Sequence, residues 1–339
     1  MAETPYVAVD VDVLDRNIAA MAATARQRGL ALRPHAKTHK SLEIARRQLA
    51  NGAAGLTVAT VSEAEVFADG GFDDLFIAYP IWPSEERARR LRALADRVRL
   101  SVGVDSMESA VALAARVGRL DVLVEVDSGH HRSGVPPKEA ELVMAAAERA
   151  GHTVRGVFTF PGHAYGPGQR LEAVKDEARA LRRAKTAAVR SGGSTPTAAM
   201  TEAGDLTEIR PGVYVFGDAQ QVELGNCTFD DVALTVAATV VSRRDGHVIV
   251  DAGSKVLGAD RLPWASGFGR LPDYPQARIV ALSEHHATIE MWQEPALGDQ
   301  LRIAPNHVCA TVNLADELIV ERAGREIDRW PVDARGANT

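Results

Sequence analysis

The chain contains near its start the stretch Leu32-Arg33-Pro34-His35-Ala36-Lys37-Thr38-His39-Lys40. A short apolar run leads into Pro34 and a helix-like pattern follows from Ser41, so the stretch predicts a strand, a tight turn and a helix. A lysine at the end of a strand, beside other cations, loses its proton more easily when it is partly desolvated, and its amine can then form a Schiff base with a carbonyl group. The alternative is a basic loop on the protein surface.

Eight strand-like segments, mostly alternating with helical ones, occur from Leu32 onward. Alternating β and α segments with apolar strands indicate a parallel sheet, and eight such units indicate a closed (β/α)8 barrel of the TIM type. The strands are expected at Leu32 and at residues 56–58, 75–78, 99–104, 122–126, 154–158, 197–200 and 212–216, with a long helix at 170–190. The sequence therefore predicts an α/β barrel domain over residues 11–224.

The pattern changes after Gly225, where short strands separated by turns follow and no helix is predicted. These strands are expected at residues 233–241, 247–250, 278–282, 287–292, 300–303, 308–312 and 317–320. The sequence thus predicts a second, all-β domain over residues 225–333. Because the first strand, before Val11, has no place in the barrel, residues 1–10 are expected to pair with this domain.

The composition is that of a globular protein with ample material for a core: of 339 residues, 46% are hydrophobic and 25% are charged. The formal net charge of −6 offers no broad basic surface, so we expect no nucleic-acid partner. The first residues show no apolar signal segment and no run reaches the roughly 18 apolar residues of a membrane helix, so we expect no membrane partner. Two cysteines, Cys227 and Cys309, do not form a disulfide framework, which favours a reducing, cytoplasmic location.

Polar side chains collect at the predicted carboxyl ends of the barrel strands, where barrel enzymes carry their active sites. They are Lys37, His39, Asp127, His130, Arg132, His163, Tyr165, Arg210 and Tyr214. Each alone could be a structural polar residue, but their collection at one face favours a functional site. Arg132 lies between Gly129 and Gly134 and could donate to an anionic oxygen, although a charged surface loop is the alternative.

Two further loops, at residues 191–197 and 210–214, are rich in small residues and hydrogen-bond donors. Backbone N–H groups and hydroxyls in such loops suit a phosphate group. Neither loop matches a P-loop or a dinucleotide fingerprint, so ATP and NAD are not indicated.

The segment 305–313 carries a second pair of reactive side chains. His307 and Cys309 are two residues apart on a predicted strand, so both should point to one face. An imidazole and a thiolate together suit zinc, and two protein ligands leave positions for water or substrate. The alternative is a buried thiol beside a hydrogen-bonded histidine. Cys227 has no such neighbour and is expected to be structural.

The stretch 33–40 resembles the pyridoxal-phosphate lysine motif of the D-serine dehydratase and D-threonine aldolase family, whose members are fold-type III enzymes built like alanine racemase. The resemblance runs over nearly the whole chain and includes residues 125–134, 210–214, 251–255 and 305–313. It implies that Lys37 holds pyridoxal 5'-phosphate. It also implies a homodimer in which the β-domain of the second copy completes each site.

The resemblance assigns roles to the remaining residues. Arg132 is implied to meet the phenolic oxygen of the cofactor, and Arg210 occupies the position that faces the pyridine nitrogen in the racemase. The phosphate is implied to lie between the hydroxyls of Ser194 and Thr195 and the backbone amides around Gly212. The other implied cofactor-binding residues are His35, Tyr165, Val213 and Tyr214, and His163 joins Lys37 as a catalytic residue.

Two positions depart from the family pattern. Phe160 stands where many relatives place a histidine or another polar residue under the cofactor ring, although His163 is retained. His286 stands where a small residue is usual.

The resemblance implies a metal-dependent lyase that acts on a 3-hydroxy D-amino acid such as D-serine, D-threonine or D-threo-3-hydroxyaspartate. The metal on His307 and Cys309 is expected to be zinc, with manganese or magnesium as alternatives. His-x-Cys resembles the dehydratases, which release a 2-oxo acid and ammonia. The aldolases resemble His-x-Asp and release glycine and an aldehyde. We rank elimination first, then aldol cleavage; racemisation, a cofactor carrier without turnover and a metal-dependent barrel hydrolase are further alternatives.

Overall fold

The computed structural model describes residues 2–184, 189–201, 204–293 and 295–339, and the chain divides into two compact units. The barrel unit comprises Ala20–Lys37, Ile44–Gly212 and Ala337–Thr339, and the β unit comprises Met1–Ala19, Thr38–Glu43 and Val213–Gly336. Residues 11–19, 38–43 and 213–224, expected in the barrel, thus belong to the β unit. Within the described ranges, no helix combines the length and the apolar character that a membrane crossing needs.

The barrel unit is built on an eight-stranded parallel sheet, as the alternation of β and α segments predicts. Its order is β2-β9-β8-β7-β6-β5-β4-β3, and a parallel bridge between His35 and Thr57 joins the two edge strands, so the sheet closes. The strands are β2 (Ala31–Leu32), β3 (Leu56–Val58), β4 (Asp74–Pro80), β5 (Arg99–Val104), β6 (Asp121–Glu125), β7 (Thr153–Phe158), β8 (Val189–Gly192) and β9 (Glu208–Ile209).

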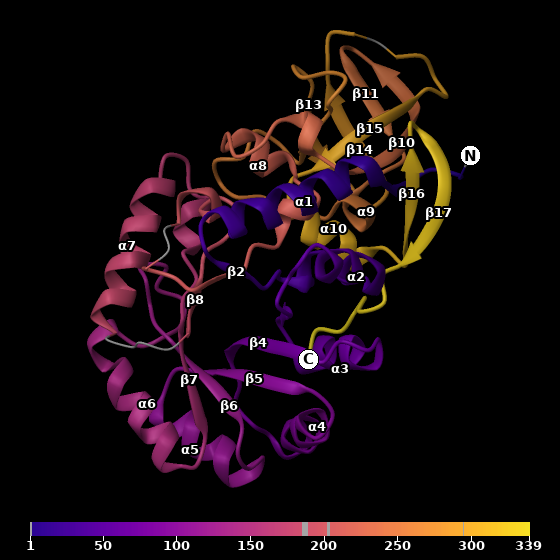
Figure 1. Ribbon diagram of the computed structural model, residues 1–339. Helices are drawn as coiled ribbons and strands as arrows, with labels where there is room; N and C mark the ends of the chain where they lie inside the picture. Colours follow the sequence, from indigo (N-terminus) through magenta and orange to yellow (C-terminus); the bar gives the residue numbers. More distant parts are fainter. Residues whose placement is uncertain (1, 185–188, 202–203, 294) are drawn as a thin grey trace. The chain divides into compact units, whose positions relative to one another are not determined.

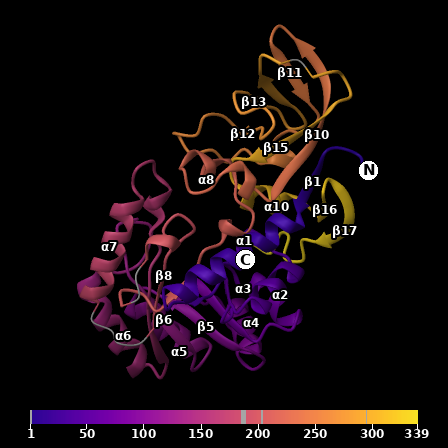
Figure 2. The same ribbon diagram turned by 45° about the horizontal axis from the view of Figure 1, so that its top comes forward.

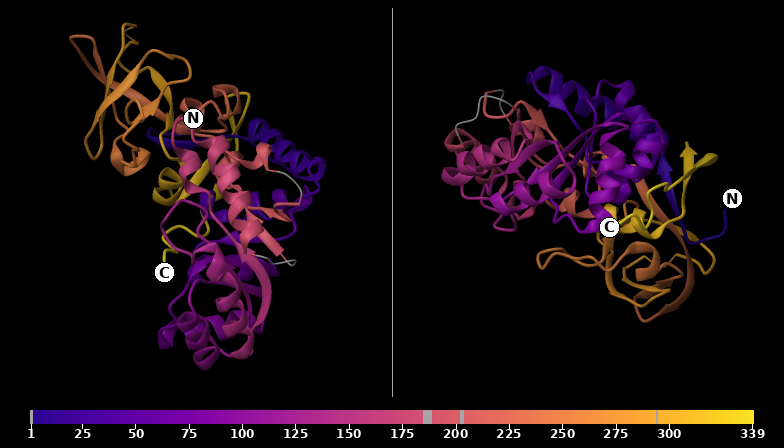
Figure 3. Two further views of the ribbon diagram at one scale, coloured as in Figure 1. Left: turned by 90° about the vertical axis from the view of Figure 1, so that its left-hand side faces the viewer. Right: turned by 90° about the horizontal axis from the view of Figure 1, so that it is seen from below.

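Helices cover the outside of these strands (Figure 1, Figure 3). They are α2 (Leu42–Ala50), α3 (Val61–Asp69), α4 (Glu85–Ala95), α5 (Met107–Arg116), α6 (Ala140–Arg149) and α7 (Arg170–Arg183), while α1 (Val11–Gln27) belongs partly to each unit. The side chains of Thr60, Ser84 and Ser106 accept the backbone N–H three residues on, which fixes where α3, α4 and α5 begin. Because the strands are covered on both faces, they read as nearly continuous apolar runs.

Ion pairs occupy part of the barrel interior. Arg33 donates to Asp74 at 2.7 Å and to Glu208 at 2.8 Å, and each of the three side chains is at most 20% exposed. These contacts join the ends of β2, β4 and β9, so the residue that precedes Pro34 ties the closing seam of the barrel together.

The β unit contains a nine-stranded sheet whose main path runs β13-β14-β11-β10-β1-β16-β17, with β15 paired to β10 and to β12. Its strands are β1 (Tyr6–Asp10), β10 (Leu234–Arg244), β11 (His247–Val250), β12 (Gly269–Arg270), β13 (Arg278–Leu282), β14 (Ala287–Glu290), β15 (Gln300–Pro305), β16 (Glu317–Arg322) and β17 (Arg325–Pro331). Strand β1 pairs antiparallel with β10 and parallel with β16 (Figure 2). Residues 6–10 therefore pair with the C-terminal strands rather than with the barrel.

The prediction of a helix-free C-terminal part was wrong. After Gly225 the β unit contains α9 (Ser254–Leu257) and α10 (Val308–Leu314), while α8 (Ala219–Glu223) lies before this region. Helix α10 replaces the strand expected at 308–312, and its buried residues Val308, Thr311 and Val312 follow the i, i+3, i+4 spacing of a helix face. The short apolar run therefore fitted both periodicities, and the helical one is correct.

The last two barrel strands were also misplaced. Residues 198–200 form a 3₁₀ turn, η4 (Ala198–Met200), and residues 213–215 form another, η5 (Val213–Val215). The true strands, β8 and β9, have only four and two residues, too short for an alternation to show. The helix expected at 170–190 ends at Arg183; residues 185–188 lie outside the described residues, and Val189 already begins β8.

Candidate active site

Lys37 lies in η1 (Ala36–Thr38), the turn that follows β2, at the carboxyl end of the barrel strands. It lines a cavity of about 530 Å³ in the barrel unit together with His35, Tyr79, Arg132, Phe160 and Arg210. The last two basic residues of the stretch, His39 and Lys40, have structural roles in the β unit. His39 is fully buried and its Nδ1 accepts the Ser41 N–H at 3.1 Å, while Lys40 donates to the carbonyl of Ala334 at 3.2 Å.

An aromatic ring forms one wall of this cavity. The Lys37 Nζ lies 5.9 Å from the centroid of the Phe160 ring, and the Arg132 guanidinium carbon lies 5.0 Å from the same centroid. Tyr165 is tilted beside that ring, with the two centroids 6.3 Å apart. The cavity thus combines an amine, a guanidinium group and an apolar face.

The loop that carries Arg132 is held by a carboxylate at its base. Asp127 accepts the N–H of Gly129 at 2.9 Å and the N–H of His131 at 3.0 Å, and it pairs with the His131 ring at 2.6 Å. Burial raises the pKa of Asp127, but these hydrogen bonds outweigh burial and leave the pKa below its usual value. The loop after β6 is therefore a fixed platform for Arg132.

Arg210 is buried at the end of β9 and reaches across the barrel. Its guanidinium group donates to the carbonyl of Thr159 and lies over Phe158 and Phe76, 5.3 Å and 5.6 Å from their ring centroids. Burial lowers the pKa of Arg210 to about 10, opposed by the carboxylates of Glu208 and Glu177. Arg210 lines the same cavity as Lys37.

The turn after β8 is closed by its own hydroxyl groups. The Ser194 N–H donates to Thr197 Oγ1 at 2.9 Å, and the two hydroxyl oxygens are 3.2 Å apart. Ser194 is buried and Thr195 is half-buried. Gly212 is the last residue of the barrel-unit segment Ile44–Gly212. Val213 and Tyr214 begin η5, which belongs to the β unit. None of these six residues lines the cavity itself.

His163 lies behind the Arg132 loop. Its Nε2 is 3.5 Å from the Asp176 carboxylate, and a Cβ at Gly129 would lie 3.3 Å from its ring. Neither ring nitrogen makes a hydrogen bond to another described residue. The ring therefore stands beside the cavity rather than on its surface.

The barrel residues fit pyridoxal phosphate in their chemistry. Lys37 supplies an amine for the aldehyde, Phe160 an apolar face for the ring, and Arg132 a donor for an anionic oxygen. The volume of about 530 Å³ lies within the usual range for small-molecule sites.

His307 and Cys309 come together at the first turn of α10. His307 occupies the N-cap position of this helix without a side-chain capping hydrogen bond. Asp260 bonds its Nδ1, so Nε2 is the ring nitrogen that could serve as a metal ligand. Burial lowers the pKa of His307, but Cys309, Asp218 and Asp260 outweigh it and raise this pKa to about 10. A metal would have to displace this proton, which makes binding pH-dependent.

Asp218 forms a hydrogen bond with the backbone of the same segment. Its carboxylate accepts the Gln221 N–H at 2.9 Å and the Val308 N–H at 3.2 Å, so it caps α8 and also fixes the backbone between His307 and Cys309. Among the described residues no group of three or more His, Cys, Asp and Glu side chains is arranged as a metal site. The two side chains fit an open site in which water or substrate supplies the other ligands.

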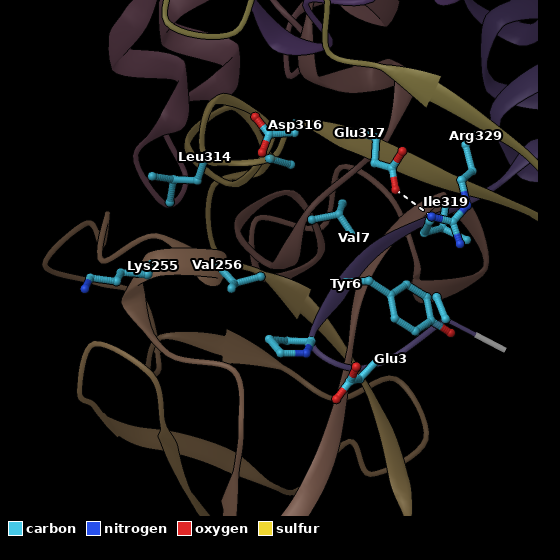
Figure 4. Close-up of a pocket in the computed structure, with 13 residues that line it drawn as sticks. Glu3, Tyr6, Val7, Lys255, Val256, Leu314, Asp316, Glu317, Ile319 and Arg329 are labelled. Atoms are coloured by element: carbon cyan, nitrogen blue, oxygen red, sulfur yellow. Dashed lines mark hydrogen bonds and ion pairs between the residues drawn. The ribbon is translucent and has the colours of Figure 1, made fainter.

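The β unit has a second cavity of about 600 Å³, shown in Figure 4. Its walls come from β1, β16, β17 and the residues around Val256 and Leu314. Two of its basic groups form ion pairs, Arg329 with Glu317 at 2.8 Å and Lys255 with Glu284 at 2.7 Å. None of the predicted site residues lines it.

Several residues that shape the site were missed in the sequence. Asp218 and Asp260 are lone acids in loops, and nothing in their sequence neighbourhood separates them from surface acids. Only Glu177 carried a usable signal, because it shares the helix face of Ala173, Ala180 and Leu181.

Both parts of the chain are similar to known protein families. The family model of the alanine racemase N-terminal domain matches residues 9–220, and that of a putative serine dehydratase domain matches residues 233–321. D-threo-3-hydroxyaspartate dehydratase from Delftia sp. (strain HT23) is 36% identical over 351 residues, covering 91% of this chain and 91% of that protein. D-threonine aldolase from Arthrobacter sp is 35% identical over 360 residues, covering 98% and 93%.

A solved D-threo-3-hydroxyaspartate dehydratase variant, with a cysteine replaced by alanine and in the metal-free form, superposes with a TM-score of 0.90 at 31% identity, covering 98% of this chain and 97% of that one. Another solved variant of a protein of that name carries alanine in place of a histidine two positions before this cysteine. The spacing is that of His307 and Cys309. The chain therefore belongs to the alanine racemase-like, fold-type III family of pyridoxal-phosphate enzymes that carry a serine dehydratase domain.

Proposed function

We propose that the protein is a pyridoxal-phosphate- and metal-dependent lyase that removes water from a 3-hydroxy D-amino acid and releases a 2-oxo acid and ammonia. The observation that carries the proposal is the place of Cys309: its thiol donates to the hydroxyl of Thr38 across 3.3 Å, and Thr38 directly follows Lys37. A metal ligand and a cofactor-binding lysine are thereby tied to neighbouring residues. The relatives named above act, by their names, on 3-hydroxy D-amino acids.

When bound, the cofactor supplies an electron sink for a bond broken at Cα and the metal a Lewis acid for a departing hydroxyl. Lys37 is the base that takes the Cα proton, because its amine lines the cavity and Phe160 partly desolvates it. Arg132 orients the cofactor through an anionic oxygen. His163 is a second candidate acid or base beside the cavity.

The proposed elimination breaks two bonds of the substrate, Cα–H and Cβ–O. The Cα–H proton passes to Lys37 and the Cβ–O bond breaks. The departing hydroxyl takes that proton from Lys37 and leaves as water. The remaining unsaturated amine isomerises to an imine, and water then releases ammonia and the 2-oxo acid. His307, through Nε2, and Cys309, through Sγ, would hold the metal, which would supply a Lewis acid for the hydroxyl.

The second candidate is aldol cleavage to glycine and an aldehyde, which requires a base for the 3-hydroxyl proton instead of the Cα proton. The 35% identity to D-threonine aldolase supports aldol cleavage as the second candidate. The thiolate at position 309 favours elimination, since the aldolases resemble His-x-Asp at this place. We further propose zinc as the metal and a cytoplasmic homodimer as the working form.

The test is a product assay on the metal-loaded protein with D-serine, D-threonine and D-threo-3-hydroxyaspartate, in which 2-oxo acid and glycine are measured side by side. We expect a 2-oxo acid that disappears in Lys37→Ala and falls at least tenfold in Cys309→Ala. Glycine with an equal amount of aldehyde would establish the aldolase instead. A change of configuration alone would establish a racemase.

A further inference from the structure

Glu177 is a carboxyl group on the core face of α7, where the neighbouring buried residues are Ala173, Ala180 and Leu181. Its side chain is 1% exposed. Burying a carboxyl group there is unfavourable unless hydrogen bonds replace its water. The position therefore needs a reason beyond packing.

The hydrogen bonds of Glu177 lead to the carboxyl ends of two barrel strands. Its Oε1 accepts the Gly193 N–H at 2.9 Å, just after β8, and also accepts the hydroxyl of Thr159, just after β7. Its Oε2 is buried and has no hydrogen-bond partner among the described residues. One oxygen atom thus joins the residue after β7 to the first residue of the turn 193–195, which follows β8.

The same contacts extend to Arg210. The Arg210 guanidinium group donates to the Thr159 carbonyl, and the Arg210 N–H donates to the Gly192 carbonyl at 2.8 Å. A Cβ at Gly192 would press on the Glu177 carboxyl and lie 2.6 Å from Thr159 Oγ1. Glycine at 192 and glutamate at 177 therefore fit one another.

We propose that Glu177 is a positioning residue that holds the turn 193–195 in the shape that binds the phosphate of the cofactor. This inference rests on the proposed function, since it takes Ser194 and Thr195 as the phosphate donors. A charged carboxylate would repel a phosphate dianion. Burial raises the pKa of Glu177, which favours the neutral form and removes this conflict.

The test compares two ligands that differ only in the phosphate, pyridoxal 5'-phosphate and pyridoxal. Their dissociation constants are measured by equilibrium dialysis on protein from which cofactor has been removed. For Glu177→Ala we expect pyridoxal phosphate to bind about ten- to a hundredfold more weakly, because the Gly193 N–H loses its acceptor. Pyridoxal should bind as in the wild type. Glu177→Gln keeps the accepting oxygen and should keep the wild-type ratio of the two constants.

Two further variants keep the test decisive. Glu172→Ala removes an exposed carboxylate from the same helix, 56% exposed, and should change neither constant. If Glu177→Ala does not fold, Glu177→Asp, whose shorter side chain does not reach Gly193, takes its place with the same expectation. Equal weakening of both ligands, or no change, would overturn the inference and give Glu177 a purely structural role. A wild-type protein that binds neither ligand would instead refute the proposed function.

Discussion

The Cys309 thiol donates a hydrogen bond to the hydroxyl of Thr38, with 3.3 Å between sulfur and oxygen, and Thr38 is fully buried. Because Thr38 follows Lys37 directly, the Cα atoms of these two residues are about 3.8 Å apart. In a 3-hydroxy amino acid the Cα proton and the hydroxyl sit on adjacent carbons. Within the β unit, Thr38 therefore ties the Cys309 thiol to the residue that directly follows Lys37 in the chain.

Thr38→Val should weaken zinc binding about ten- to a hundredfold, because the hydroxyl that orients the Cys309 sulfur is lost. Thr38→Ser keeps the hydroxyl and should bind zinc like the wild type. The dissociation constants can be measured by competition with a chromophoric chelator. Equal affinity in the valine and serine variants would show that the hydrogen bond does not organise the metal site.

Cys309→Asp should change the preferred metal. A carboxylate suits manganese and magnesium better than a thiolate does, whereas the thiolate favours zinc. We expect zinc affinity to fall by at least tenfold and the ratio of manganese to zinc affinity to rise. Metal titrations of Cys309→Asp and Cys309→Ala, side by side, check this; the same metal ranking in both variants would count against Cys309 as a ligand.

Phe160→Leu should weaken cofactor binding, because leucine keeps most of the apolar volume but offers no aromatic face to Lys37 and Arg132. A cation–π contact contributes about 0.5–2 kcal/mol, so the dissociation constant of pyridoxal phosphate should rise about two- to thirtyfold. Phe160→Tyr keeps the ring and serves as the control. An unchanged constant in the leucine variant would remove Phe160 from the cofactor site.

Arg33→Met should destabilise the barrel unit by about 3–5 kcal/mol, because the buried Glu208 loses its ion-pair partner and Asp74 keeps only the exposed Arg99 at 3.3 Å. The exposed pair of Arg97 and Asp69 provides the control, since Arg97→Met should change stability by at most about 1 kcal/mol. Urea unfolding of both variants measures the difference. Similar shifts of the two midpoints would contradict a structural role for the Arg33 ion pairs.

Glu177→Gln should gain stability relative to the wild type as the pH rises. The pKa of Glu177 is raised above 4.5 by burial, so its contribution to stability is fully present below the unfolded value and is lost as pH rises through the folded value. Glutamine does not ionise and loses nothing. Unfolding free energies measured from about pH 4 to about pH 8 should diverge in favour of glutamine. A constant difference across this range would mean that Glu177 titrates normally.

The barrel was readable from the sequence because strands β4 to β7 have five to seven residues each, long enough for an apolar run to stand out between helices. Strands β8 and β9 were not, since four and two residues carry no periodicity of their own. Their pairing depends on the sheet already formed by β7. The division of the chain was equally out of reach, because the β unit takes its residues 38–43 from the middle of the barrel sequence.

The candidate site was readable to the extent that its chemistry is local. Lys37 and Arg132 lie in short motifs, and the structure brings them to one cavity with Arg210 and Phe160. The pairing of His307 with Cys309 followed from their separation of two residues, although a helix start rather than a strand presents them. Asp218 and Asp260 act through contacts that are distant in sequence, so no local pattern reveals them, whereas Glu177 shares the buried face of α7.

The most direct test of the central claim, that Lys37 removes the Cα proton, is hydrogen exchange of D-alanine. This substrate has no 3-hydroxyl group, so the reaction can go no further than proton removal and return. The holoenzyme is incubated with D-alanine in deuterium oxide and the α-proton signal is followed by NMR. We predict loss of this signal in the wild type but not in Lys37→Ala, without formation of L-alanine. An α-proton that persists in the wild type while D-threonine is cleaved to glycine would contradict the account.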